Sequence, residues 1–184
     1  EYRLPEDSLP VHDWIGYPDT EIVGGVVREH GLPIAPQELL EHKRQIFRRL
    51  IAEQLEAVPG SVQALSELKS LPLGLATSSS RSEAELMLRI LGITDRFLTI
   101  VTGDDVERTK PEPDSYLLAA ERLGVAPEHC VAIEDSSSGV QSAREAGMTV
   151  LAVTNTLPAE RLTAAHQIFA SVPEAVGWIK SRLS

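Results

Sequence analysis

The order of apolar and polar residues along this chain predicts strands and helices in alternation. From Pro59 onward, short apolar runs are separated by segments in which apolar residues recur at helical spacing. Three of these segments close on a glycine, at Gly92, Gly124 and Gly147. Strands that alternate with helices form parallel sheets with helices on both faces. The pattern therefore predicts an α/β fold, with strands at residues 72–77, 97–103, 129–135, 149–154 and, more weakly, 168–171.

In the first part of the chain the pattern of apolar and polar residues is different. Residues 20–31 and 36–58 carry helical spacing with no strand pattern between them. Pro59-Gly60 then breaks the second helix. We therefore expect two domains, a helical one at residues 1–57 and the α/β domain at residues 58–184.

The net charge of the chain limits the kinds of partner that it is expected to bind. The chain has 184 residues, 42% of them hydrophobic, and a formal net charge of −10. An acidic chain has no electrostatic reason to bind nucleic acid or anionic membranes. It can still bind a small phosphorylated metabolite where a metal ion and lysines invert the local field.

Cysteine content and hydropathy bear on the compartment. The chain has one cysteine, Cys130, which excludes an internal disulfide and fits a reducing compartment. No apolar run approaches the roughly 18 residues that a membrane span needs. We therefore expect a cytoplasmic protein, as a monomer or a weak dimer.

In parallel sheets, active sites lie beyond the carboxyl ends of the strands. The strand at 72–77 ends at Thr77 and is followed by Ser78, Ser79, Ser80 and a helix. A hydroxyl beside the free backbone N–H groups of a helix start can bind phosphate. The alternative is that the serines only cap the helix.

Two further segments carry charge near strand ends. Lys110 stands in a loop between prolines, where it is either a solvated surface residue or a group that neutralises a phosphate. Glu134 and Asp135 end the strand at 129–135 as two adjacent acids. Such a pair repels unless a cation lies between, and carboxylates at an open site suit Mg²⁺. The alternative is that Asp135 caps the next helix while Glu134 faces water.

These segments resemble a known family. "GLATSSSR", "TKPEPDSYLLAAERLGV" and "CVAIEDSSSGVQSAREAGM" are similar to the second, third and fourth motifs of the haloacid-dehalogenase-like phosphohydrolases. The similar group contains phosphoglycolate phosphatase, sugar-phosphate phosphatases and beta-phosphoglucomutase. The resemblance implies a Rossmann-like core and makes residues 1–57 part of a small α-helical cap.

The resemblance also implies roles for individual residues. Thr77 would bind the transferring phosphoryl group, with Ser78 and Ser79 beside it, and Lys110 would neutralise the nucleophile and the phosphoryl oxygens. Glu134 and Asp135 would hold Mg²⁺, directly or through water. Gly139 would let the following helix pack closely. The implied activity is Mg²⁺-dependent phosphatase chemistry through an aspartyl-phosphate.

One family motif is missing. No D-x-D sequence, which in the family supplies the nucleophile, the acid/base and a metal ligand, occurs in this chain. The strand before that motif is central in the family's sheet, so its absence predicts a gap between the strands ending at Thr77 and Asp135. Such a gap would leave buried backbone groups unpaired. We therefore expect the nucleophile in a segment before Glu1; without it, the chain would be a non-catalytic phosphate-binding module.

Three enzyme types remain to be weighed. A mutase of this group carries a cap arginine for a second phosphate, and Asp19 in "WIGYPDTEIV" falls at the matching place, which favours a phosphatase. Asp19 could instead cap a helix that starts at Thr20. A dehalogenase would have no use for the acid pair. Candidates to contact the leaving group are His12, Trp14, Tyr17 and Arg81, although such residues more often serve packing or lie at the surface.

Overall fold

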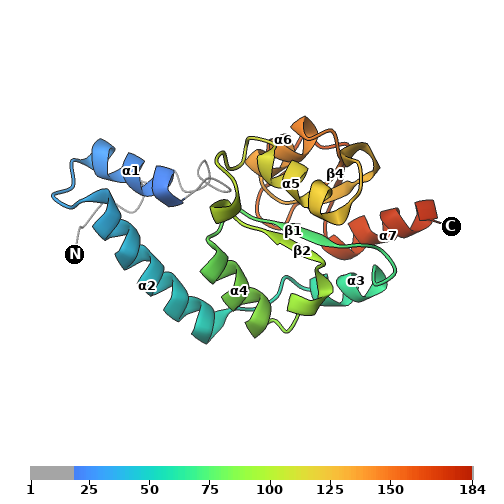
Figure 1. The fold of residues 1–184 in the computed structure, drawn as a ribbon, viewed down its shortest axis with the longest axis horizontal. Coiled ribbons are helices and arrows are strands. Elements are labelled where there is room, and N and C mark those ends of the chain that lie inside the picture. Colours follow the sequence, from blue (N-terminus) through green and yellow to red (C-terminus); the bar gives the residue numbers. More distant parts are fainter. Residues whose placement is uncertain (1–18, 184) are drawn as a thin grey trace.

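The computed structural model describes residues 19–183. Helices and strands alternate from residue 61 onward, as the sequence predicts (Figure 1). The helices are α1 (Asp19–His30), α2 (Pro36–Gln54), α3 (Ser61–Glu67), α4 (Arg81–Ile90), α5 (Asp114–Leu123), α6 (Ser137–Glu145) and α7 (Val172–Leu183). The strands are β1 (Gly74–Ala76), β2 (Thr99–Val101), β3 (Val131–Glu134), β4 (Thr149–Val153) and β5 (Gln167–Phe169).

The strands form two parallel sheets rather than one. The first has the order β1–β2, with Leu75 opposite Ile100, and the second has the order β3–β4–β5, with Ile133 opposite Leu151. The break lies between β1 and β3, the strands that lead to Thr77 and Asp135, where the sequence predicts a gap. Both strands therefore present a backbone edge that pairs with no other strand of residues 19–183.

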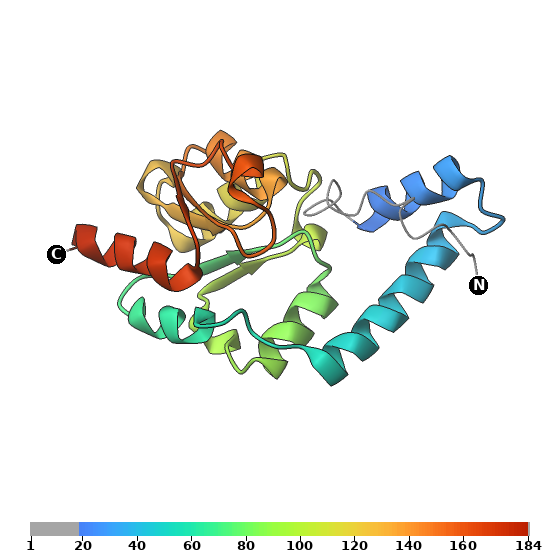
Figure 2. The ribbon, with the colours of Figure 1, turned by 180° about the vertical axis from the view of Figure 1, so that it is seen from behind.

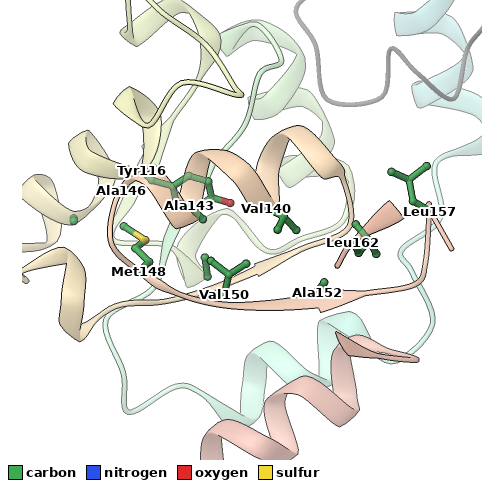
Figure 3. Close-up of a cluster of buried hydrophobic side chains, with 11 residues drawn as sticks. Tyr116, Val140, Ala143, Ala146, Met148, Val150, Ala152, Leu157 and Leu162 are labelled. Carbon is green, nitrogen blue, oxygen red and sulfur yellow. The ribbon is translucent and has the colours of Figure 1, made fainter. Parts of the chain in front are cut away.

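Strand β4 separates two apolar cores. Its residues alternate between faces, because successive side chains of a strand point to opposite sides. Val150 and Ala152 pack with α5 and α6, where Figure 3 shows them facing Val140 and Ala143. Leu151 and Val153 pack on the other side, against residues of α3 and α7. The three-stranded sheet is thus covered on both faces, which confirms the predicted layering.

Helices α1 and α2 form an antiparallel hairpin that extends away from the sheets (Figures 1 and 2). Helix α2 begins with Pro36, whose fixed φ suits a first helical position. Leu40 of α2 and Val23 of α1 are among the apolar residues buried in the hairpin. Arg48 Nη2 donates a hydrogen bond of 3.1 Å to Ser82 Oγ and ties α2 to α4. The division into domains at residue 57 stays a prediction.

No helix in the described part of the chain is both long and apolar enough to cross a membrane.

Candidate functional site

A cavity of about 720 Å³, which we call the cleft, opens at the carboxyl ends of β1 and β3. The loops after β1, β2 and β3 line one side, and helix α2 supplies the other. Six of the predicted site residues line it: Thr77, Ser78, Ser79, Lys110, Glu134 and Asp135. The topology therefore brings together side chains that are up to 58 positions apart in sequence, from Thr77 to Asp135.

Lys110 and Glu134 form a buried ion pair at the base of the cleft. Each side chain is 7% exposed. Lys110 Nζ donates to Glu134 Oε1 and also, at 3.1 Å, to the carbonyl oxygen of Ala76 in β1. The ammonium lies 4.9 Å from the centre of the Tyr116 ring. Lys110 therefore bridges the break between the sheets, and the expectation that it could be a solvated surface residue is wrong.

Glu134 is fully engaged by hydrogen bonds. Tyr116 Oη donates to Glu134 Oε1 at 2.5 Å, while Ser136 Oγ at 3.1 Å and the Asp135 N–H at 3.3 Å donate to Oε2. Burial alone would raise the pKa of Glu134, but the Lys110 charge and these bonds outweigh it and hold that pKa below its usual value. Burial and the neighbouring Glu134 charge raise the pKa of Tyr116 well above 10.0. Glu134 is thus a stable anion and Tyr116 a stable hydrogen-bond donor.

The helix after β3 is fixed by a serine and a glycine. Ser136 is the N-cap of α6, and its hydroxyl accepts a hydrogen bond of 3.1 Å from the Gly139 N–H. A Cβ atom on Gly139 would lie well under 3.0 Å from the Glu134 carboxylate. The expectation that Gly139 allows close packing is supported by this geometry, whereas the alternative in which Asp135 caps the helix and Glu134 faces water is wrong.

Asp135 is the acid that remains open to a metal. It lines the cleft, and its Oδ2 accepts a hydrogen bond of 2.5 Å from Thr156 Oγ1. Both oxygens of Glu134 accept hydrogen bonds, Oε1 from Lys110 and Oε2 from Ser136, and its role toward a metal stays a prediction. Within residues 19–183 no group of three or more His, Cys, Asp or Glu side chains is arranged to hold a metal. Among residues 19–183, Asp135 lines the cleft with a carboxylate of the type that binds Mg²⁺, and its role as a metal ligand stays a prediction.

In the loop after Thr77, backbone N–H groups already donate hydrogen bonds to side-chain oxygens of the protein. The Ser79 N–H donates to Thr77 Oγ1 at 3.1 Å, which leaves the Thr77 hydroxyl proton for another acceptor. The Ser80 N–H donates to Glu83 Oε2 at 3.3 Å, and the Arg81 N–H donates to Asp104 Oδ2 at 2.8 Å. The helix start therefore does not present the run of free N–H groups that the sequence suggested. Ser80 is the helix N-cap, as the alternative held.

Arg81 belongs to a structural network at the end of β2. Its guanidinium donates to the Ile100 carbonyl at 3.2 Å and to Asp105 Oδ2 at 2.5 Å. Asp105 also accepts bonds from the Thr102 N–H and hydroxyl and from Arg122. Burial alone would raise the pKa of Asp105, but the bonds from Thr102, Arg122 and Arg81 hold it far below its usual value. Arg81 is not among the described residues that line the cleft.

We expect Asp105→Asn to cost about 1–3 kcal/mol of unfolding free energy at pH 7. Because the folded-state pKa of Asp105 is lowered, its contribution is complete above the unfolded pKa of about 3.9 and is lost as pH falls through the folded value. Urea unfolding between pH 7 and pH 3 should show the deficit shrinking with acid. Asp95→Asn, at an exposed position, is the control; a deficit independent of pH would contradict the assignment.

The sequence did not single out the wall that α2 supplies to the cleft. Lys43, Arg44 and Phe47 line it, and Lys43 pairs with Asp19 and lies 5.4 Å from the centre of the Phe47 ring. The helical spacing of "EHKRQIF" was a usable signal, since it places these residues within about one turn. His12, Trp14 and Tyr17 lie outside the described residues, so their predicted contacts stay predictions.

Comparison with known proteins gives a consistent family. The model of the haloacid dehalogenase-like hydrolases matches residues 9–153. The fructose-1-phosphate phosphatase YqaB of Escherichia coli is 33% identical over 83% of this chain and 81% of its own length. The phosphorylated carbohydrates phosphatase of Thermotoga maritima is 42% identical over 67% of this chain. The match spans 62% of that protein and 50% of the E. coli phosphoglycolate phosphatase.

Solved structures agree. Beta-phosphoglucomutase from Clostridium difficile has a TM-score of 0.81 and 25% identity, over 93% of this chain and 79% of the other. CbbY from Rhodobacter sphaeroides, solved in complex with phosphate, has a TM-score of 0.81 and 28% identity, over 91% and 80%. With its strand-end acids, lysine and threonine gathered in one cleft, this chain belongs to the haloacid dehalogenase-like hydrolase family.

Proposed function

We propose that this chain forms the phosphate-binding part of a Mg²⁺-dependent phosphatase that acts on a small phosphorylated metabolite. The observation that carries the proposal is the meeting of Thr77, Lys110 and Asp135 in one cleft. Thr77 keeps a hydroxyl proton to donate. Lys110 has three N–H donors, of which two bind Glu134 and Ala76, so one is left for a phosphoryl oxygen.

The charges of the cleft support the metal dependence. Within the described part of the chain, its lining carries seven carboxylates, from Asp19, Glu21, Glu83, Asp104, Glu107, Glu134 and Asp135, but three cations, from Lys43, Arg44 and Lys110. This balance repels a phosphate dianion unless another cation is present. A Mg²⁺ ion on Asp135, completed by water and phosphate oxygens, would supply that charge and stabilise the transition state.

The proposed route passes through an aspartyl-phosphate, as the family resemblance implies. The D-x-D motif does not occur in residues 1–184, so this route needs an aspartate from elsewhere. In it, Thr77 and Lys110 position and neutralise the transferring group, and such groups supply most of the catalysis in phosphoryl transfer. Denaturing mass spectrometry of the phosphorylated protein made from the complete gene would show an acid-stable, alkali-labile adduct on an aspartate.

Protein made from the complete gene should release phosphate from fructose 1-phosphate only in the presence of Mg²⁺. Thr77→Val should lower kcat/KM by about 10²–10³, because a donor to the transferring group is lost. A colorimetric phosphate assay with Mg²⁺ or with EDTA measures both effects, and Thr163→Val at an exposed turn is the control. Phosphate release that is equal with EDTA, or unchanged in Thr77→Val, would refute the proposal.

A mutase is the second candidate, because beta-phosphoglucomutase structures share the fold. The cap position expected to carry a phosphate-binding arginine is Asp19, whose side chain pairs with Lys43 in the cleft. The pair leaves no surplus positive charge for a second phosphate, which favours the phosphatase. Conversion of β-glucose 1-phosphate to glucose 6-phosphate with a bisphosphate primer would favour the mutase; no release from any phosphate ester would favour a non-catalytic phosphate-binding module.

A further inference from the structure

Two side chains that line the cleft each contain a buried polar atom that lacks a hydrogen-bond partner within residues 19–183. One is Nε of Arg44 on α2, and the other is Oε1 of Glu83 on α4. Both residues line the cleft, and Glu83 is 3% exposed as a whole. Unpaired buried polar atoms cost free energy, so a pair of them in one cavity calls for a partner that the protein does not supply.

The two atoms have complementary roles. Arg44 Nε carries an N–H and can only donate, while its Nη1 already donates to Glu41 at 3.2 Å. Glu83 Oε1 is a carboxylate oxygen, while Oε2 accepts from the Ser80 N–H and from the Ser80 hydroxyl at 2.7 Å. A hydroxyl group accepts one hydrogen bond and donates another. A ligand that presents hydroxyl groups to this part of the cleft can therefore satisfy both atoms.

The contact between helices α2 and α4 brings Arg44 and Glu83 to the same part of the cleft. Arg48, one helical turn after Arg44 on the same face of α2, binds Ser82, the neighbour of Glu83. The Arg44 side chain is 28% exposed and Glu83 is 3% exposed, so Arg44 is the more open of the two residues to a ligand in the cleft.

The carboxylates that line the cleft disfavour leaving groups that carry a negative charge. Glu83 contributes a carboxylate to the lining of the cleft, and Asp104 and Glu107 contribute two more. A ligand that carries its own carboxylate, such as phosphoglycolate, is repelled by these acids. A neutral, hydroxylated leaving group meets no such repulsion and gains the two hydrogen bonds.

We propose that Arg44 and Glu83 form a leaving-group subsite that binds a substrate hydroxyl and directs the enzyme to sugar or polyol phosphates rather than to carboxylate-bearing phosphates. The proposal rests on the proposed function, since it assumes that the phosphate of the same ligand lies at Thr77 and Lys110. Glu83 also closes the capping box of α4, so a test must separate the two roles.

Glu83→Gln makes that separation. Glutamine keeps an oxygen for Ser80, because it is accepted in capping boxes, but it places an NH₂ donor where Oε1 had been. We expect fructose 1-phosphate to bind this chain at least about tenfold more tightly than phosphoglycolate, measured by calorimetry at saturating Mg²⁺. In Glu83→Gln the affinity for fructose 1-phosphate should fall by about tenfold or more, while that for phosphoglycolate should rise. Arg44→Met should weaken the binding of fructose 1-phosphate in the same way.

Matched controls use the same chemical changes outside the cleft. Glu85→Gln, on the same helix with a half-exposed side chain, and Arg49→Met, exposed on α2, should leave the preference between the two ligands unchanged. Equal shifts for both ligands in Glu83→Gln would assign Glu83 to structure alone and overturn the proposal. So would tighter binding of phosphoglycolate by the wild type, or no measurable binding of fructose 1-phosphate. The phosphate-release assay on protein from the complete gene decides the proposed function separately.

Discussion

Replacing Lys110 by methionine should destabilise the folded protein by about 3–5 kcal/mol at pH 7, because it leaves the buried Glu134 carboxylate without its counter-charge. Urea unfolding followed by circular dichroism measures the loss. Lys180→Met removes an ion pair with Glu67 in which the side chains are 49% and 51% exposed, and should cost at most about 1 kcal/mol. The difference between these variants isolates the effect of burial.

The pH dependence identifies the cause. In the wild type the folded-state pKa of Glu134 is lowered, so the stability it contributes is present above the unfolded pKa of about 4.3 and is lost as pH falls through the folded value. Without Lys110 burial dominates and the folded pKa rises above the unfolded one. The deficit of Lys110→Met should therefore begin to shrink as the pH falls through that raised pKa, above the unfolded value of about 4.3, and should shrink further below it as the wild type loses its own contribution.

A second variant tests whether the lost stability comes from the unpaired Glu134 charge. Adding Glu134→Leu to Lys110→Met removes both buried charges and should recover part of the lost stability, since paired apolar replacements are often tolerated. A Lys110→Met deficit no larger than that of Lys180→Met, or one that grows as the pH falls, would contradict the structure.

Gly139→Ala should cost about 3–5 kcal/mol of unfolding free energy, because the new methyl group enters the space of the Glu134 carboxylate. That carboxylate cannot move aside without losing Lys110 and Tyr116. The better helix propensity of alanine offsets at most about 1 kcal/mol.

Gly177→Ala is the matched control, since Gly177 lies in helix α7 and a Cβ there meets no atom within 4 Å. It should stabilise the protein by about 0.5–1 kcal/mol. Chemical denaturation of both variants gives the comparison, and a Gly139→Ala protein as stable as the wild type would show that Glu134 has room to move.

Local signals explain why so much of the fold was predictable. Gly124, with its positive φ of 67°, ends α5 as the glycine signal indicated. Helix α2 ends at Gln54 rather than near residue 58, because Leu55 turns to an extended conformation with ψ of 119°. The pairing of strands in two sheets depends on contacts between distant segments, which periodicity does not report.

The candidate site was predictable as a set of residues but not as a set of contacts. The strand-end rule located Thr77, Lys110 and Asp135 correctly at one cleft. Sequence could not show that Glu134 would be paired with Lys110, because 24 positions separate them. Tyr116 was missed for the same reason, since its hydroxyl reaches Glu134 only after α5 has packed against β1 and β2.

The bridge that Lys110 makes between the two sheets links binding to architecture. Its ammonium holds the Ala76 carbonyl on one side and the Glu134 carboxylate on the other, and Lys110 also lines the cleft. An anion that draws on this charge competes with the contact between the sheets, and by thermodynamic reciprocity the strength of that contact sets part of the anion's affinity. Ligand occupancy and the cohesion of the two halves are therefore coupled equilibria that share one side chain.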